Sequence, residues 1–230
     1  MDFLDNIPTS RYVDTNWLVS MISPLPQHES KTRLLDAALH VIRAKGYSAT
    51  RIEDVCEAAG LTKGSFFYHF KGKEDLALEA ADYWSYRTAA LFASAEYHDM
   101  TRLPDPVDRL LAYIDLRKAL IQGELPDFTC LVGTMVQEIY DTQPAIREAC
   151  NQSISGHAAT LVPDIEEAMR QRGIRGTWTA ESLALYTQAS IQGAFILAKA
   201  KQNPVVAVAL IDHLRRYFEL LFNQPQSSPS

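Results

Sequence analysis

The spacing of apolar residues from Glu29 to Phe222 constrains the fold more than any other feature of the sequence. Apolar side chains recur three or four positions apart, which places them on one face of a helix, and no segment gives a convincing strand pattern. Beyond Lys73, helical segments are expected at residues 74–98, 106–122, 130–140, 145–172, 180–201 and 204–222. Pro163 should kink or break the long segment that contains it, and Asn203 followed by Pro204 should begin the last segment. The sequence predicts an all-α fold.

Residues 30–76 contain three helical signals in close succession. The first helix should end near Gly46, and its buried stripe is Leu34, Leu35, Ala38, Leu39 and Ile42. A second helix of about two turns should end at Gly60, with Ile52, Val55, Cys56 and Ala59 on its apolar face. Two short helices behind a longer one, joined by a turn that contains glycine, are typical of a helix-turn-helix.

Threonines are expected to begin the second and third of these helices. Thr50 and Glu53 form a capping-box pattern, in which each side chain would bind the backbone amide of the other residue. Thr62 can cap the third helix, which Lys71 and Gly72 should close after about two turns. In this arrangement the third helix is the one presented outward.

The third helix carries an unusual number of aromatic rings. Phe66 and Phe70 are four residues apart and should pack inward on the preceding helices. The other faces carry a cation, a hydroxyl group and more rings, from Lys63, Ser65, Phe67, Tyr68 and His69. Side chains of this composition are suited to contact base edges and phosphates. Gly64 would permit close backbone approach, and Lys73 would add a phosphate contact at the start of the next helix. Periodicity alone leaves open a second interpretation, in which Phe67 and Tyr68 pack against the helical body and Lys63 is merely solvated.

The distribution of charge is informative, although the net charge of -6 argues against a nucleic-acid partner for the chain as a whole. Residues 30–76 hold eight basic and six acidic side chains, a net charge of +2, so the remainder carries -8. This asymmetry indicates a mildly basic module attached to an acidic body.

Several classes of protein are not favoured by the sequence. The amino terminus lacks the pattern of a secretory signal, and no apolar run is long enough for a membrane helix, so we expect a cytoplasmic protein. The three cysteines are widely spaced and lack a CxxC pair, which indicates neither a disulfide framework nor a zinc site. No nucleotide-binding, hydrolase or metalloprotease motif is present, so we expect neither an enzyme, a cofactor nor a bound metal.

Residues 30–76 resemble the amino-terminal domain of the tetracycline-repressor (TetR) family of bacterial transcriptional regulators. Three stretches carry the resemblance: LLDAALHVIRAKGYSAT, RIEDVCEAAGLTKGSFFYHF and KGKEDL. It implies a DNA-binding helix-turn-helix domain at residues 30–76 and an effector-binding and dimerisation domain at residues 77–230. Apart from the resemblance, residues 1–29 contain three prolines and show no sustained period, so we expect an arm with a short helix near 15–22.

The resemblance also implies which residues contact DNA. Thr50 and Arg51 would hold phosphate at the second helix, and Lys73 would bind another phosphate. The recognition surface would consist of Thr62, Lys63, Gly64, Ser65, Phe67, Tyr68 and His69. The position of Phe67 is often tyrosine in the family, so here a phosphate hydrogen bond is replaced by ring contact alone.

The family binds a near-palindromic operator as a dimer and is usually released by a small effector, so a repressor of this kind is expected. Polar or polarisable side chains on apolar faces are the candidate effector-binding residues: Trp84, Tyr113, Met135, Gln137, Tyr140, His157, Tyr186, Gln188, Gln192 and Phe195. For His157, a hydrogen-bonded core histidine is the competing interpretation.

Two carboxy-terminal helices are expected to pair with their symmetry mates in a four-helix bundle. A strip of small residues and a broad apolar face would form the interface: Ser190, Gly193, Ala194, Ala198, Val206, Leu210, Leu214, Tyr217, Phe218 and Leu221. The alternative is that both faces are buried within one chain.

Two alternatives to a ligand-released repressor remain. Cys130 stands at the expected start of a helix, where the helix terminus favours the thiolate, so the regulator could sense electrophiles or oxidants. An inert buried thiol is the simpler interpretation of this residue. A helical adaptor that uses the same surface for protein contacts, without DNA, is the second alternative.

Overall fold

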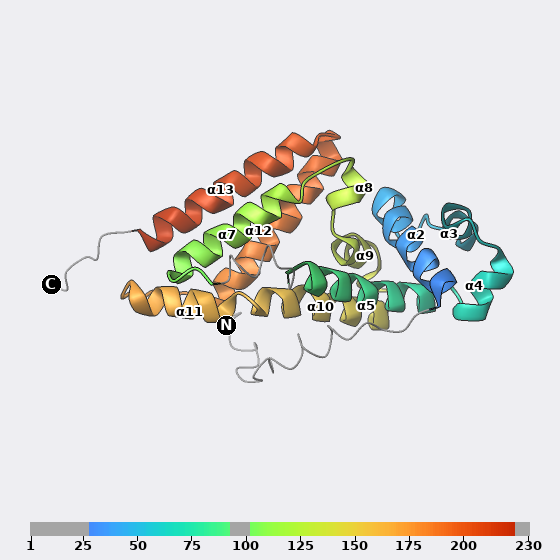
Figure 1. Ribbon diagram of the computed structural model, residues 1–230, viewed down its shortest axis with the longest axis horizontal. Helices are drawn as coiled ribbons and strands as arrows, with labels where there is room; N and C mark the ends of the chain where they lie inside the picture. The colour runs from blue at the N-terminus through green and yellow to red at the C-terminus, as the bar shows by residue number, and fades with distance from the viewer. Residues whose placement is uncertain (1–27, 93–101, 224–230) are drawn as a thin grey trace.

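The computed structural model describes residues 28–92 and 102–223, and these residues fold into helices without strands. The amino-terminal helices are α2 (Glu29–Lys45), α3 (Ile52–Ala59) and α4 (Lys63–His69), and α5 (Lys73–Phe92) follows them. Figure 1 shows α3 and α4 at one end of the molecule, with α2 between them and the other helices. The arm at residues 1–27, including the expected short helix, and residues 93–98 of the segment expected after Lys73 lie outside the described residues.

The remaining helices form a body beside α2 and α5. They are α7 (Pro106–Ala119), α8 (Leu125–Phe128), α9 (Leu131–Ile139), α10 (Pro144–Ala159), α11 (Val162–Gln171), α12 (Ala180–Lys201) and α13 (Pro204–Phe222). In Figure 1, α5 and α10 run side by side along one edge of this body, and α7, α12 and α13 form the opposite part. The all-α prediction is confirmed.

Local signals explain most of the helix ends. The break at Pro163 is confirmed, because α10 ends at Ala159 and α11 begins at Val162. Asn203 caps α13 by accepting a hydrogen bond from the Val205 amide at 3.0 Å, as expected. The short α8 was not expected from the sequence.

The predicted stripes of α2 and α3 are confirmed as core. Leu34, Leu35, Ala38 and Ile42 are almost fully buried, and Val55 and Cys56 of α3 face the same core. Burial of these apolar side chains is what stabilises a helix as short as α3, since isolated helices of this length are marginal in water.

Gly46 lies at the junction between α2 and the body. Its φ of 89° is positive, as a glycine after a helix permits, although its ψ of 161° is not that of the left-handed helical region. A Cβ at this position would lie 2.2 Å from a carboxylate oxygen of Glu138 on α9. That carboxylate accepts hydrogen bonds from the backbone amides of Tyr47 at 3.1 Å and Ser48 at 2.7 Å. Gly46 therefore allows α9 to hold the turn between α2 and α3.

A second group of contacts joins α2 to the body. The Arg43 guanidinium donates to the backbone carbonyl of Asp127 at 3.0 Å and lies 5.2 Å from the ring centroid of Trp84. Asp36 accepts from the Tyr83 hydroxyl at 3.0 Å and pairs with Arg87 at 2.6 Å. These contacts fix α2 against α5 and the segment that contains α8.

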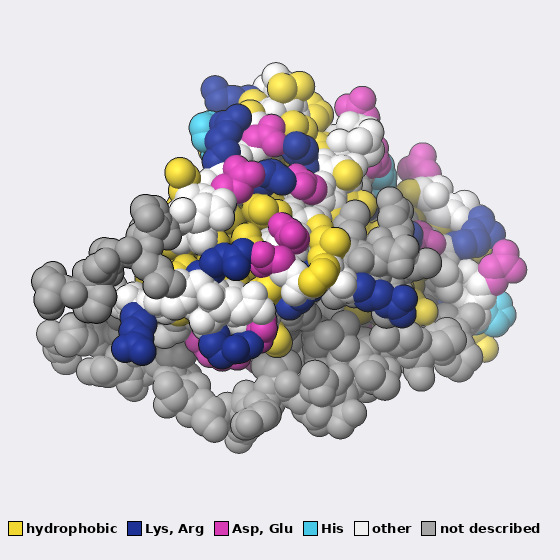
Figure 2. All heavy atoms as spheres, turned by 60° about the vertical axis from the view of Figure 1, so that its left-hand side comes forward, with side chains coloured by type: hydrophobic (Ala, Val, Ile, Leu, Met, Phe, Trp, Pro, Cys, Tyr) yellow, Lys and Arg dark blue, Asp and Glu magenta, His cyan; other side chains and the backbone are white. Residues whose placement is uncertain are grey.

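The face of the body shown in Figure 2 has basic and acidic side chains intermixed with hydrophobic ones. Ion pairs join α7 to α13, between Lys118 and Asp212 at 2.8 Å and between Arg215 and Asp115 at 2.9 Å. Partly exposed pairs contribute little stability each. They do show that one side of α13 is already covered by α7 within the chain.

Candidate nucleic-acid interface and small-molecule pocket

The third helix, α4, presents two rings outward and two inward. Phe66 and Phe70 have 0% and 1% of their surface exposed, whereas Phe67 and Tyr68 have 56% and 78% exposed. The predicted orientation of the helix is therefore confirmed. Two exposed rings on a seven-residue helix forgo the stabilisation that their burial would give. They therefore indicate a surface that contacts another molecule.

The turn before α4 is rigidly defined. Gly60 has the left-handed conformation, with φ 62° and ψ 38°, and the Arg33 guanidinium donates to the Ala59 carbonyl at 2.6 Å. The Thr62 side chain then accepts from the Ser65 amide at 3.2 Å, which confirms Thr62 as the cap of α4. The angle between α3 and α4 is thus set by backbone geometry and capping.

The capping box before α3 lies one residue later than expected. The Arg51 amide donates to the Asp54 carboxylate at 2.8 Å, so Arg51 rather than Thr50 is the capping position. Thr50 is 2% exposed, and its hydroxyl donates to the Gly46 carbonyl at 2.6 Å. The Thr50–Glu53 capping box was therefore wrong, and the Thr50 side chain does not reach the surface where it was expected to hold phosphate.

Arg51 stays exposed beside this cap. Its guanidinium pairs with Asp54 at 2.9 Å. Hydrogen bonds from Arg51 and Lys45 hold the pKa of the Asp54 carboxyl well below its ordinary value. Asp54 therefore remains ionised and holds the Arg51 guanidinium near the start of α3.

The remaining predicted DNA contacts differ in how freely they reach solvent. Thr62, Lys63 and Gly64 are exposed, and Lys63 pairs with Glu53 of α3. Lys73 is partly buried, where it donates to the Ser48 carbonyl at 3.1 Å and lies 4.3 Å from the Tyr47 ring centroid. Thr62, Lys63 and Gly64 lie at the start of α4, and Lys73 lies at the start of α5.

Ser65 and His69 are partly buried on α4. His69 Nε2 is hydrogen-bonded to the Ser30 hydroxyl at 2.6 Å, so the ring turns toward the start of α2. Burial is the largest cause that lowers the pKa of His69, which favours the neutral ring.

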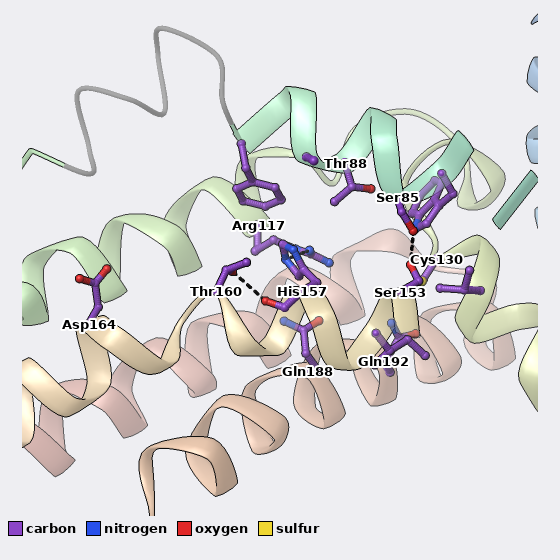
Figure 3. A pocket seen from close by; sticks show the side chains of 15 residues that line it. Ser85, Thr88, Arg117, Cys130, Ser153, His157, Thr160, Asp164, Gln188 and Gln192 are labelled. Carbon is purple, nitrogen blue, oxygen red and sulfur yellow. Dashed lines mark hydrogen bonds between the residues drawn. The ribbon is translucent and has the colours of Figure 1, made fainter. Parts of the chain in front are cut away.

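The body contains a cavity of about 270 Å³ between α5, α7, α9, α10 and α12, which α11 borders through Asp164. Figure 3 shows its labelled polar side chains converging from these helices. Its lining combines apolar and polar side chains: Trp84, Ser85, Thr88, Ala89, Phe92, Arg117, Cys130, Val132, Ser153, Ile154, His157, Thr160, Asp164, Gln188 and Gln192. An apolar cavity with a few convergent polar groups is typical of a small-molecule site.

One wall of this cavity is a hydrogen-bonded chain. The Gln188 amide nitrogen donates to the Tyr113 hydroxyl at 2.9 Å, and that hydroxyl lies 3.0 Å from His157 Nε2. Arg117 Nη1, which can only donate, lies 3.4 Å from the same nitrogen. These contacts assign Nε2 as an acceptor and place the ring hydrogen of neutral His157 on Nδ1. Burial, together with the positive charge of Arg117, lowers the pKa of His157 to about 3.

A second cavity, of about 380 Å³, adjoins the first. Both are lined by Trp84, Thr88, Phe92 and Arg117. The second also reaches α2 and α8, through Asp36, Leu39, Arg43, Arg87, Leu91, Leu120, Ile121, Asp127, Phe128 and Phe195. A molecule that extends from one cavity into the other would therefore touch the helix that supports α3 and α4.

Six of the ten predicted effector-binding residues lie in or beside the two cavities. Trp84, His157, Gln188 and Gln192 line the first cavity, Phe195 lines the second, and fully buried Tyr113 contacts two of the lining residues. The other four lie elsewhere. Met135 is 0% exposed, the Gln137 amide folds back onto the Gly133 carbonyl, and Tyr140 and Tyr186 have 62% and 47% of their surface exposed. Helical periodicity assigns a residue to a face but does not show which face borders a cavity.

Sequence reasoning missed several polar lining residues. Arg117 lies four positions after Tyr113, a spacing that places both on one helix face. Ser85 and Thr88 are small polar residues beside Trp84 and Ala89, and Ser85 donates to Ser153 at 2.8 Å. The position of a cation on the same face as Tyr113 was the signal that could have identified Arg117.

Cys130 is the capping residue of α9, as the sequence indicated. Its sulfur accepts from the Gly133 amide at 3.3 Å, and the residue is 8% exposed and lines the first cavity. Cys150 is fully buried, and burial raises the pKa of its thiol to about 12. Of the two, only the Cys130 thiol borders a cavity.

The predicted dimer residues fall into two groups. Ala194, Ala198, Leu214 and Phe218 are at most 3% exposed in the core of the chain, so assigning them to a dimer surface was wrong. Helix α12 packs against α13, and α13 packs against α7, as the alternative of burial within one chain requires. The others keep exposed surface: Ser190, Gly193, Val206, Leu210, Tyr217 and Leu221.

Among residues 28–92 and 102–223, no group of three or more histidine, cysteine or acidic side chains is arranged to hold a metal ion. No helix in the same ranges is long and apolar enough to cross a membrane.

Comparison with known proteins gives matches over both parts of the chain. Residues 34–80 match the model for bacterial regulatory proteins of the tetR family, and residues 106–214 match a tetracyclin repressor-like carboxy-terminal domain. The HTH-type transcriptional regulator LmrA of Bacillus subtilis is 27% identical over 183 residues, which cover 76% of this chain and 89% of that protein.

Solved structures show the same fold. A TetR transcriptional regulator from Chloroflexus aurantiacus J-10-FL has a TM-score of 0.70 and 28% identity, over 83% of this chain and 94% of that one. The regulator FadR of Bacillus subtilis, in complex with stearoyl-CoA, has a TM-score of 0.64 and 18% identity, over 84% and 98% of the two chains.

Proposed function

Because the chain belongs to the TetR family of bacterial regulatory proteins and is a helix-turn-helix transcriptional regulator, we propose that it is a dimeric repressor. It binds a near-palindromic operator through α4 and leaves it when a small molecule occupies the cavities of the helical body. We also propose that the protein regulates by binding and does not catalyse a reaction, and that it is cytoplasmic.

The observation that carries the proposal is the pair of exposed rings on α4. Phe67 and Tyr68 are held outward because Phe66 and Phe70 anchor the opposite face in the core. In the major groove, the Phe67 ring would contact a thymine methyl group, and the Tyr68 hydroxyl would reach a phosphate. Gly64 would allow the start of α4 to approach the DNA closely.

Polar groups around α4 would bind the DNA backbone and base edges. We assign phosphate contacts to Arg51, Lys63 and Lys73, and additional contacts to Thr62, Ser65 and His69. Lys63 must exchange the exposed Glu53 carboxylate for a phosphate. The Arg51 side chain is 73% exposed and would turn from the mostly buried Asp54 carboxylate to a phosphate. Thr50 is assigned a different role, which is to hold the turn before α3 through the Gly46 carbonyl.

The dimer is proposed to form through the outer faces of α12 and α13. Tyr186, Ser190, Gly193 and Leu197 follow one another at helical spacing, and all keep exposed surface. A Cβ added to Gly193 would meet no atom within 4 Å, so this stripe is open. On α13 the corresponding stripe is Val206, Leu210, Tyr217, Leu220 and Leu221.

These two stripes form one continuous surface. The rings of Tyr186 and Tyr217 lie 5.2 Å apart, so the stripes meet there. Two copies packed through this surface would form a four-helix bundle and place two copies of α4 on successive major grooves, roughly 34 to 36 Å apart.

Two connections would carry the state of the pocket to the DNA-binding helices. The second cavity is lined by Asp36, Leu39 and Arg43 of α2, so a ligand there would contact this helix. The first cavity borders Cys130 and Val132 at the start of α9, and Glu138 near the end of α9 holds the turn between α2 and α3. A ligand with different affinities for two positions of α2 and α9 would shift the spacing of the two α4 helices.

A gel-shift experiment tests this function. The purified protein should retard DNA from the region upstream of its own gene, and the logarithm of its affinity should fall linearly with the logarithm of salt concentration. No retardation of any fragment flanking the gene would overturn the proposal and favour the helical adaptor. Arg170→Gln, at an exposed position on α11, is a matched control that should bind like the wild type.

A second candidate function is electrophile or oxidant sensing at Cys130. It is favoured by one observation, the position of this thiol in the cavity wall at the start of α9. Quinones or peroxide should then release the operator from the wild type and from Cys150→Ser but not from Cys130→Ser. Equal release from all three proteins would dispose of this role.

A further inference from the structure

Arg117 occupies the boundary between the two cavities. It lines both of them, and Figure 3 shows it next to His157. Within the described ranges, its guanidinium forms no ion pair with a carboxylate. Its polar contact there is His157 Nε2 at 3.4 Å, and the neutral ring does not compensate its charge.

The carboxylates that line the cavities already have partners. Asp164 pairs with Arg109 at 2.8 Å, and Asp36 pairs with Arg87 at 2.6 Å. Asp127 accepts from the Glu124 amide at 2.8 Å, where it closes the first turn of α8. Arg117 is partly buried, and among the described residues no carboxylate compensates its charge, so a cation in this position favours an anion.

The surroundings of Arg117 place a second requirement on a ligand. His157 has its ring hydrogen on Nδ1, and no described residue accepts from that atom, so the wall offers a neutral donor beside the cation. The flanking surfaces are apolar, from Trp84 and Phe92 in both cavities and Ile154 in the first. A guanidinium is suited to bidentate binding of a carboxylate, and the rings are suited to a hydrocarbon or aromatic body.

From this arrangement we propose that the effector is a small organic carboxylate. Its carboxylate binds Arg117 at the boundary of the cavities, and its apolar part extends along Trp84 and Phe92. This inference rests on the proposed function, because it names the chemical class of the ligand that releases the operator. It does not depend on which DNA sequence is bound.

Calorimetric titration of the full-length protein with matched compounds tests the proposal. The probes are 4-phenylbutyrate and decanoate, their primary amides, and the amines of the same carbon skeletons. A charge-assisted hydrogen bond contributes about 1.5 to 3 kcal/mol, so each carboxylate should bind about 10- to 100-fold more tightly than its amide. The amines should bind more weakly than the amides.

Substitutions of Arg117 separate charge from packing. Arg117→Gln should abolish the preference for carboxylate over amide, and Arg117→Lys should restore part of it, because lysine retains the charge without the planar fork. Arg170→Gln should keep the preference. Thermal unfolding of each variant shows whether it is folded, and Arg117→Lys keeps the test informative if Arg117→Gln does not fold.

Three results would overturn the inference: equal affinity for carboxylates and amides, an unchanged preference in Arg117→Gln, or no binding of either carboxylate. Operator binding by gel shift, measured without any ligand, is the separate test of the proposed function. Operator release by the amides as well as by the carboxylates would leave a ligand-released repressor standing and exclude the anionic class.

Discussion

At the scale of single residues, two adjacent phenylalanines on α4 have opposite environments. Phe66 is fully buried and Phe67 is 56% exposed. Phe66→Ala should reduce the free energy of unfolding by about 3 to 5 kcal/mol, because it removes a large core side chain. Phe67→Ala should change stability little and weaken operator binding. Chemical denaturation and gel shifts on both variants check this pair, and reversed outcomes would mean that α4 faces the other way.

His157 gives a prediction about pH. The pKa of its ring is about 3 in the folded chain, against an ordinary value of 6.5. Between these values the unfolded state binds a proton that the folded state does not, so stability should fall as pH decreases below 6.5. The contribution is about 1.4 kcal/mol per pH unit, or about 2 kcal/mol at pH 5.

The measurement is urea denaturation of the wild type and His157→Gln at pH 7 and pH 5, at equal protein concentration. The wild type should lose about 2 kcal/mol more than the variant between these two values. His213→Gln, at an exposed position on α13, should behave like the wild type. Equal losses in the wild type and His157→Gln would show that the ring is not held neutral.

The sequence predicted the exposed surface of α4 better than the lining of the cavity. On α4, the spacing of Phe66 and Phe70 was enough to identify the buried side, and the exposed side followed. In the body, Trp84, Gln188 and Met135 were equally plausible on periodicity. Whether a residue borders the cavity depends on how several helices pack against one another. The sequence of a single helix does not contain that information.

At the scale of elements, the ends of helices were predicted where a strong local signal exists. Asn203 with Pro204 and the break at Pro163 were confirmed. The helix α8 has four residues, too few to show any periodicity, and it was missed. The capping box before α3 was misplaced by one residue, because the Thr50 hydroxyl donates to the Gly46 carbonyl four residues earlier instead of capping α3.

Glu138 of α9 binds the turn between α2 and α3, a contact that the sequence did not predict. Its carboxylate accepts the amides of Tyr47 and Ser48, and Ser48 in turn accepts from Lys73. Glu138→Ala should leave these amides without partners, reduce stability by about 1 to 3 kcal/mol and weaken operator binding. Glu138→Gln should have a smaller effect, because it keeps one acceptor oxygen.

Hydrogen exchange and gel shifts check the role of Glu138. The amide protons of Tyr47 and Ser48 should exchange faster in Glu138→Ala than in the wild type. Glu148→Ala, on the exposed side of α10, is the control and should change neither quantity. Unchanged exchange in Glu138→Ala would remove α9 from the proposed connection between pocket and DNA.

At the scale of the whole molecule, the two sides of α13 have different chemistry. The side toward α7 is covered by ion pairs within the chain, whereas the other side and the adjoining face of α12 remain apolar and exposed. Seven large apolar side chains on these two helices keep more than two fifths of their surface exposed: Leu185, Tyr186, Ile196, Leu197, Val205, Tyr217 and Leu220. A surface of this kind favours self-association over solvation.

Leu197→Glu tests whether this surface forms the dimer. Leu197 is 45% exposed on the stripe with Gly193, so a carboxylate there is tolerated in one chain but would be desolvated against a second copy. The variant should be folded by circular dichroism and monomeric by light scattering. Its operator affinity should fall about 10²- to 10⁴-fold, because two half-sites are no longer bound together. Tyr140→Glu, at an exposed position just after α9, should remain dimeric. A dimeric Leu197→Glu with unchanged operator affinity would move the interface to another face of the molecule.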